Sequence, residues 1–131
     1  MKKFRKTLST LTLSVVAVLL LSTVASATVD YNFQLPSTGS KYTEFENKSG
    51  SGSTAYNYAD YVGWSDTINC WVNDNSSNQL TGASAYNRAS TVSMYYAGSN
   101  GSNYYGHQVQ MQIKTGTAIF HDIDVRGRFK G

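Results

Sequence analysis

The chain has 131 residues, with 11 lysines and arginines against 8 aspartates and glutamates and a formal net charge of +3. This length allows one domain, or one domain behind a leader, and it excludes a multi-domain enzyme. Four of the basic residues lie in the first six positions and an apolar run follows them. The positive charge therefore indicates a targeting segment and not a protein that binds nucleic acid.

Residues 1–27 have the basic, apolar and small-residue order of a secretory signal peptide. Residues 8–24 are apolar apart from Ser and Thr, and Ala25-Ser26-Ala27 supplies the small residues of a cleavage site, so we expect cleavage after Ala27. The alternative is a retained membrane anchor, because about 17 mostly apolar residues can just span a bilayer for which roughly 20 are usual. We favour cleavage, secretion to the extracellular space and no stable membrane span afterwards.

The remaining residues, 28–131, hold seven basic and eight acidic side chains, a net charge of −1. Binding of nucleic acid needs clustered Lys and Arg, so this near-neutral segment predicts no nucleic-acid partner. Ser, Thr, Asn and Gly make up 43 of its 104 residues, and Leu occurs only at Leu35 and Leu80. A helix-rich core is hard to build from this composition, whereas ten Tyr and two Trp supply the large side chains of a folded domain. We expect a single all-β domain over 28–131.

Short alternating segments, separated by turns rich in Gly, Asn and Ser, run through this domain. Apolar and polar residues alternate without exception from Val29 to Leu35, and Pro36 ends this strand. Ile68, Cys70 and Val72 form one row of another strand, which places Trp71 on the opposite face. We expect seven or eight short strands, taken from segments at 29–35, 41–46 (weaker), 54–62, 66–73, 80–86 (poor), 91–97, 107–114 and a last strand or pair of strands within 119–129.

These strands predict an antiparallel β-sandwich, with the polar side of each strand facing water. A closed barrel is the alternative, because an alternating pattern does not reveal closure. Tyr95-Tyr96 and Tyr104-Tyr105 flank a Gly/Asn turn at 98–103 symmetrically, which predicts a hairpin between the strands on either side.

Candidate catalytic and metal-binding residues are few. His107 and His121 lack the spacing of a metal site, and one Cys with two His makes no zinc pattern, so we expect no metal, no cofactor and no catalytic residue. Cys70 alternates with aliphatic residues and should be a buried free thiol, rather than a reactive thiol, one half of an intermolecular bridge, or part of a dyad with either His.

Asp122 and Asp124 share a strand face, where two carboxylates could hold Ca²⁺ or perform acid/base chemistry. We favour a solvated mixed-charge face on which they pair with Arg126 and Arg128 along or across strands.

The distinctive feature is aromatic, because Tyr and Trp side chains are interleaved with Asn, Ser and Gln. Exposed aromatic and amide surfaces bind sugars and protein partners. The alternative is that most of these rings fill a core that is short of Leu. Trp71 is the strongest candidate for a working surface ring. The full set of candidate ligand-binding residues is Trp71, Trp64, Tyr58, Tyr95 and Tyr104.

The alternating strand at Tyr31 to Leu35, the Cys70-Trp71 strand, the Tyr-Tyr turn and the closing residues 125–129 together resemble a family of small secreted Firmicutes proteins of unknown function. That resemblance covers most of 28–131. Length, leader and composition are also similar to the lactococcin 972 type of secreted bacteriocin, a β-sandwich class implied to act on cell-wall precursors. This chain lacks the Gly- and Trp-rich start and the abundant His of that type. Neither resemblance supplies a catalytic residue.

These observations lead to one expected function and two alternatives. We expect a secreted, non-catalytic protein that binds a component of a cell envelope or extracellular matrix through an aromatic and amide surface. The partner would be a cell-wall glycan, a lipid-linked precursor or a surface protein. The first alternative is a bacteriocin-like antimicrobial protein that acts on the cell wall of related Gram-positive bacteria, and the second is a small hydrolase that uses His107 or His121.

Overall fold

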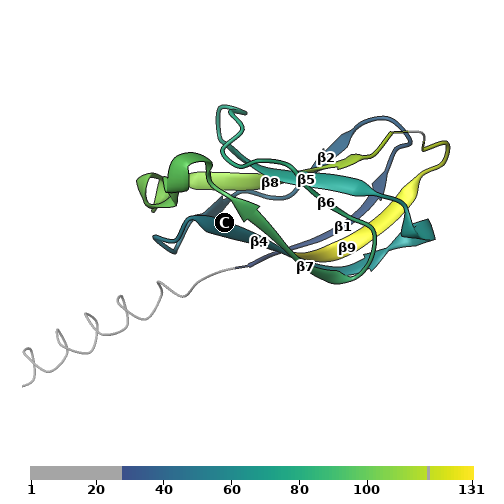
Figure 1. Ribbon diagram of the computed structural model, residues 1–131, viewed down its shortest axis with the longest axis horizontal. Coiled ribbons are helices and arrows are strands. Elements are labelled where there is room, and N and C mark those ends of the chain that lie inside the picture. Colours follow the sequence, from purple (N-terminus) through teal and green to yellow (C-terminus); the bar gives the residue numbers. More distant parts are fainter. Residues whose placement is uncertain (1–27, 118) are drawn as a thin grey trace, which may run out of the picture.

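The computed structural model describes residues 28–117 and 119–131, so the predicted signal peptide at 1–27 lies outside the described residues. Nine strands form two antiparallel sheets around one apolar core, which confirms the predicted all-β sandwich (Figure 1). None of the helices in the described part is long and apolar enough to cross a membrane. The strands are β1 (Val29–Leu35), β2 (Ser40–Tyr42), β3 (Glu46–Asn47), β4 (Thr54–Val62), β5 (Ile68–Asp74), β6 (Ser84–Tyr86), β7 (Ser90–Tyr95), β8 (Gln108–Thr115) and β9 (Ile123–Lys130).

The two sheets have different strand orders. Sheet A has the order β1-β9-β4-β7, and sheet B has the order β2-β8-β5-β6 with β3 paired to β8 as well. Each long strand alternates between the core and the outside, because successive side chains of a strand point to opposite faces. The fully buried positions that result include Leu35, Ile68, Met94, Met111, Ile113, Ile123, Val125 and Phe129.

The core also holds a polar cluster. The Tyr31 hydroxyl donates to Asn57 Oδ1 at 2.7 Å, and Asn57 Nδ2 donates to Cys70 Sγ at 3.7 Å. Gly127 makes room for this arrangement, since a Cβ there would lie 2.6 Å from the Tyr31 hydroxyl oxygen. Cys70 is fully buried and forms no disulfide bond within the described residues, which confirms the prediction of a buried free thiol.

The strand count differs from the prediction of seven or eight because the segment at 41–46 forms two strands, β2 and β3. Thr43 separates them. Its N–H donates to the Met111 carbonyl at 2.9 Å, but the Met111 N–H donates to Thr43 Oγ1, also at 2.9 Å. A side-chain oxygen thus replaces the backbone carbonyl in the ladder and interrupts the strand.

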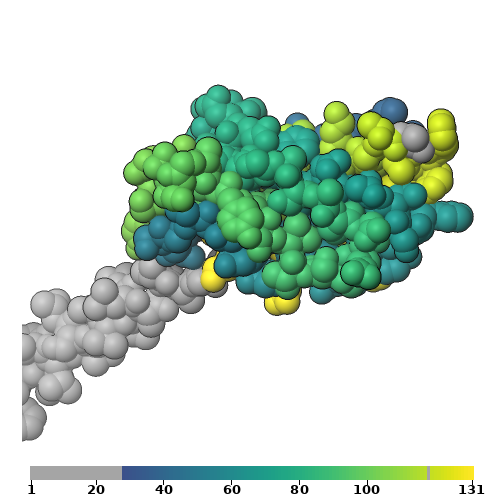
Figure 2. Space-filling model, viewed as in Figure 1, coloured from purple at the N-terminus to yellow at the C-terminus, as the bar shows by residue number. Residues whose placement is uncertain are grey.

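The hairpin predicted around residues 98–103 is wrong. β7 pairs with β4 in sheet A, whereas β8 pairs with β5 and β2 in sheet B. Two 3₁₀ turns, η2 (Ala97–Ser99) and η3 (Gly101–Tyr104), carry the chain between the sheets. They lie at one end of the molecule, and the third turn, η1 (Gly63–Ser65), lies at the other end with the yellow residues before β9 (Figures 1 and 2).

Candidate functional site

The structure places the five predicted ligand-binding residues in four different regions. Trp71 lies on the outward side of sheet B, and Tyr58 and Tyr95 lie on the outward side of sheet A. Trp64 belongs to η1 at one end of the sandwich, and Tyr104 belongs to η3 at the other. Only Tyr58 and Tyr95 share a surface, so each region is described by itself.

Trp71 lies half-buried in the middle of sheet B, on the opposite face from Ile68, Cys70 and Val72, as its strand position predicts. Its cross-strand partner on β8 is Gln112, and the partner of Gln112 on β2 is Tyr42, which is 49% exposed. Two aromatic side chains therefore flank one amide in a single row across three strands. We call the outward side of sheet B around this row the amide face.

Hydrogen bonds hold the amides of this face in fixed orientations. Asn73 Nδ2 donates to Gln112 Oε1 at 2.8 Å, and Gln112 Nε2 donates to Ser40 Oγ at 2.9 Å. Gln110, one step along β8, donates from Nε2 to the Thr43 carbonyl at 3.0 Å. Amide groups that are already oriented lose little side-chain entropy when they bind a ligand, so the amide face is preorganised.

The outward side of sheet A carries Tyr58 and Tyr95 together with the cations of β9. The ion pairs predicted here are absent, since no carboxylate among the described residues lies within 4.0 Å of the Arg126 or Arg128 guanidinium. Arg126 instead lies 4.8 Å from the ring centroid of Tyr61, and Arg128 lies 5.4 Å from that of Tyr58. The predicted mixed-charge pairing is therefore wrong, because the guanidinium groups lie over tyrosine rings instead.

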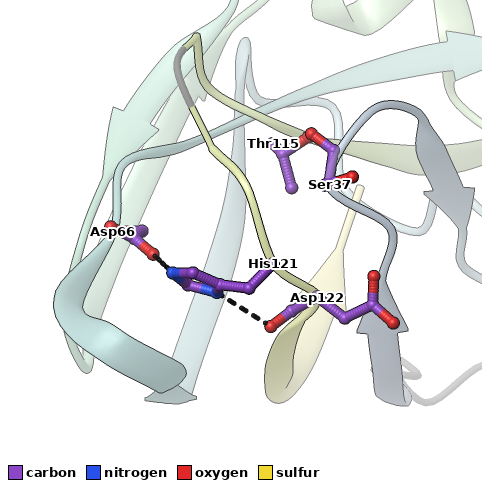
Figure 3. A network of polar contacts seen from close by, with 5 residues as sticks. All are labelled: Ser37, Asp66, Thr115, His121 and Asp122. Atoms are coloured by element: carbon purple, nitrogen blue, oxygen red, sulfur yellow. Dashed lines mark hydrogen bonds and ion pairs between the residues drawn. The ribbon is translucent and has the colours of Figure 1, made fainter.

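Trp64 is 77% exposed, and its backbone has a left-handed φ of 62°. Its ring packs against His121 with a centroid distance of 4.7 Å. Figure 3 shows that His121 Nε2 points to Asp66 Oδ2 at 3.0 Å, and that His121 Nδ1 lies 3.2 Å from the Asp122 carbonyl oxygen. Both ring nitrogens of His121 therefore face oxygen atoms of the protein itself.

Tyr104 and His107 belong to the opposite end of the molecule. The Tyr104 ring stacks on buried Tyr96 with centroids 5.7 Å apart, and it meets the His107 ring edge-on at 6.4 Å. Tyr104 is partly buried against the core, so its main contacts are structural.

The candidates for nucleophilic or metal chemistry are not assembled into a site. Burial raises the pKa of the Cys70 thiol to about 12, which keeps it protonated and unreactive at neutral pH. Among the residues that the structure describes, no group of three His, Cys, Asp or Glu side chains could hold a metal ion. Asp122 and Asp124 are exposed, Asp122 just before β9 and Asp124 within it.

Sequence reasoning did not single out Tyr42, Gln112 or the two arginines as candidate ligand-binding residues. Polar residues alternate with Val109, Met111 and Ile113 along β8, and this pattern in the sequence already indicates that Gln112 points outward. The neighbours of Gln112 depend on the pairing of β8 with β2 and β5, which come from segments far apart in the sequence.

No model of a known protein family matches the chain, and no curated protein matches it.

Proposed function

We propose that this chain is a secreted, non-catalytic protein that binds a glycan of a cell envelope or extracellular matrix on its amide face. The observation that carries the proposal is the row of Trp71, Gln112 and Tyr42, with the Gln112 amide held from both sides. An aromatic ring offers an apolar surface to a sugar ring, and fixed amides donate to and accept from the polar groups around it.

The chemistry of this face favours a neutral glycan that carries acetamido groups. Amide side chains pair with an acetamido group as both donor and acceptor, whereas a charged ligand would gain little from them. A non-catalytic role is supported by the burial of Cys70, which keeps its thiol from a substrate, and by His121, whose two ring nitrogens face oxygen atoms of the protein. The signal peptide predicted at 1–27 supports the extracellular location.

The test is binding of the purified protein to isolated peptidoglycan and to chito-oligosaccharides. Trp71→Ala should weaken binding at least tenfold, since it removes the central ring of the row. Trp64→Ala is the matched control, because Trp64 is the other tryptophan of the chain and lies at the end of the sandwich. Unchanged binding by Trp71→Ala would remove Trp71 from the site and refute the proposal.

Fluorescence gives a second readout because the chain has two tryptophans. Trp64→Phe leaves Trp71 as the single reporter, and chito-oligosaccharides should change its emission. Trp71→Phe leaves Trp64, whose emission should stay constant.

A growth-inhibition assay on related Gram-positive bacteria separates the proposed function from the bacteriocin-like one. Clearing of the bacterial lawn by the purified protein would favour the bacteriocin-like function.

A further inference from the structure

The outward side of sheet A carries a second set of aromatic side chains, each opposite a cation. From Arg126 to Lys130, β9 presents a basic residue at every second position, and β4 pairs with it in the antiparallel register. Asp124 occupies the outward position before Arg126. Alternate residues of a strand lie about 7 Å apart, so the backbone positions of the three cations are evenly spaced. We call this surface the cation–tyrosine face; its cross-strand pairs are Tyr61 with Arg126, Tyr58 with Arg128 and Tyr56 with Lys130.

A β-bulge in β4 completes this face. The pairing of β4 with β9 shifts between Ala59 and Tyr61, which makes Asp60 an extra residue. Without the extra residue, Tyr61 would have the parity of the core-facing positions Asn57 and Ala59. The bulge instead turns Tyr61 outward beside Arg126, in the way that bulges re-aim side chains at functional sites.

The orientation of Arg128 indicates that its guanidinium is available to a ligand. Arg128 has Asp30 as its cross-strand neighbour on β1 and Tyr58 as its neighbour on β4. Opposite charges at directly paired positions usually attract, yet no ion pair with Asp30 forms within 4.0 Å. The guanidinium lies over the Tyr58 ring, and Tyr56 stacks on Tyr58 with centroids 5.9 Å apart. A guanidinium held over a ring by a cation–π contact keeps its N–H groups for bidentate binding of an anion.

A shallow hollow of about 330 Å³ adjoins Arg128. Tyr58, Arg128 and the hydroxyl-bearing Ser90 and Thr91 line it, and the carboxylate-bearing Asp60 lines it as well. The hollow thus combines a ring, a guanidinium and hydroxyl groups, which are the partners that a carboxylated sugar needs for its ring face, its anion and its own hydroxyls.

We propose that the cation–tyrosine face binds a linear acidic polysaccharide, with carboxylates on Arg126 and Arg128 and a sugar unit in the hollow beside Tyr58. The even spacing of the cations suits a polymer that follows β9. This proposal concerns a different sheet and a different ligand charge from the proposed function, and the two stand independently.

Two other anionic partners fit this face less well. Nucleic acid binding depends on neutralising many phosphates, and this face offers three cations in a protein segment whose net charge is −1. An anionic membrane would approach the whole sheet, and the exposed carboxylates of Asp30, Asp60 and Asp124 lie on the same side. A narrow polymer that runs between β9 and β4 from residue 126 to residue 130 contacts the cations and leaves Asp30, on β1, and Asp124 outside its path.

The test measures affinity of the purified protein for polygalacturonate oligomers, with their methyl esters as a matched uncharged ligand. Wild type should bind the acid at least tenfold more tightly than the ester. Arg126→Lys with Arg128→Lys keeps the charge but loses the planar fork, and should weaken binding of the acid at least tenfold. Arg126→Gln with Arg128→Gln should reduce binding below detection. Urea unfolding of each variant verifies that the fold is intact.

Lys41→Gln with Lys114→Gln is the matched control, because it removes the same net charge from sheet B. It should change the affinity less than twofold, as should Trp71→Ala. The proposal is overturned if this control weakens binding as much as the arginine variants do, or if the lysine variants bind like wild type. Equal affinity for the ester, or binding to phosphatidylglycerol vesicles or duplex DNA in place of polygalacturonate, would also overturn it.

Discussion

Glu46 makes the stability of this protein depend on pH between about 4.5 and 7. The side chain is 7% exposed; its Oε1 accepts a hydrogen bond from the Gly131 N–H, and its buried Oε2 has no hydrogen-bond partner among the described residues. Burial raises the pKa of Glu46 from 4.5 to about 7, although the Gly131 N–H and the cations of Lys130 and Lys48 each lower it. Desolvation of the carboxylate therefore outweighs three favourable interactions.

The sign of the effect follows from the direction of the shift. A carboxyl whose pKa is higher in the folded state binds its proton more tightly there, so folding is most favourable when the group is protonated. Stability should be highest below pH 4.5 and fall as the pH rises to about 7. A change from 4.5 to about 7 in the pKa corresponds to about 3 kcal/mol of unfolding free energy.

The perturbation is Glu46→Gln, which keeps the shape and an acceptor for the Gly131 N–H but cannot ionise. Urea unfolding at pH 4 to 9, followed by tryptophan fluorescence, gives the free energy of unfolding of both proteins. The variant should gain about 3 kcal/mol relative to wild type between pH 4.5 and 7.5. The two proteins differ only at residue 46, so the difference between their pH profiles isolates Glu46. A difference that stays constant over this range would refute the reasoning.

Three further predictions concern the core. Gly127→Ala should destabilise the protein by about 1 to 3 kcal/mol, because its Cβ would clash with the Tyr58 carbonyl oxygen and would lie 2.6 Å from the Tyr31 hydroxyl oxygen. Gly50→Ala, which meets nothing within 4 Å, should change the urea midpoint little. Asn57→Ala should cost about 1 to 3 kcal/mol in the same assay, since it leaves the buried Tyr31 hydroxyl without its acceptor. Cys70 should react with a thiol reagent no faster than the protein unfolds, because its pKa is about 12 and it is fully buried; rapid labelling in native buffer would contradict this.

The parts of the fold that the sequence predicted best are those set by local alternation. The bounds of β1 match the predicted segment at 29–35, because a strand with one buried side has a strict period of two. The bounds of β4 match the predicted segment at 54–62 as well, although the bulge at Asp60 breaks its alternation. The split at Thr43 could not be predicted, since it depends on a hydroxyl that reaches the Met111 N–H on a strand 68 residues away. The false hairpin had the same cause: symmetric Tyr pairs around a turn do not show which sheet each strand joins.

The candidate surfaces were predictable to a lesser degree than the fold. The outward position of Trp71 could be predicted from the alternation of its own strand. Its neighbours on the amide face, Gln112 and Tyr42, depend on the order of the strands in the sheet. Arg126 and Arg128 illustrate the same limit. Their sequence neighbours are Asp122 and Asp124, which favoured a charge-paired face, whereas β4 brings Tyr61 and Tyr58 beside them in space.

The near-zero charge of residues 28–131 does not show how the charged and amide side chains are distributed over the two faces of the sandwich. β9 is a central strand of sheet A, so its outward cations lie next to the tyrosines of β4. β8 is a central strand of sheet B, so its outward amides lie in the middle of that sheet. The outward sides of two packed sheets are separated by both layers, which lie about 10 Å apart. Substitutions on the two faces should for this reason act additively. A protein that combines Trp71→Ala with Arg126→Gln and Arg128→Gln should lose both ligands, and each parent variant should lose one.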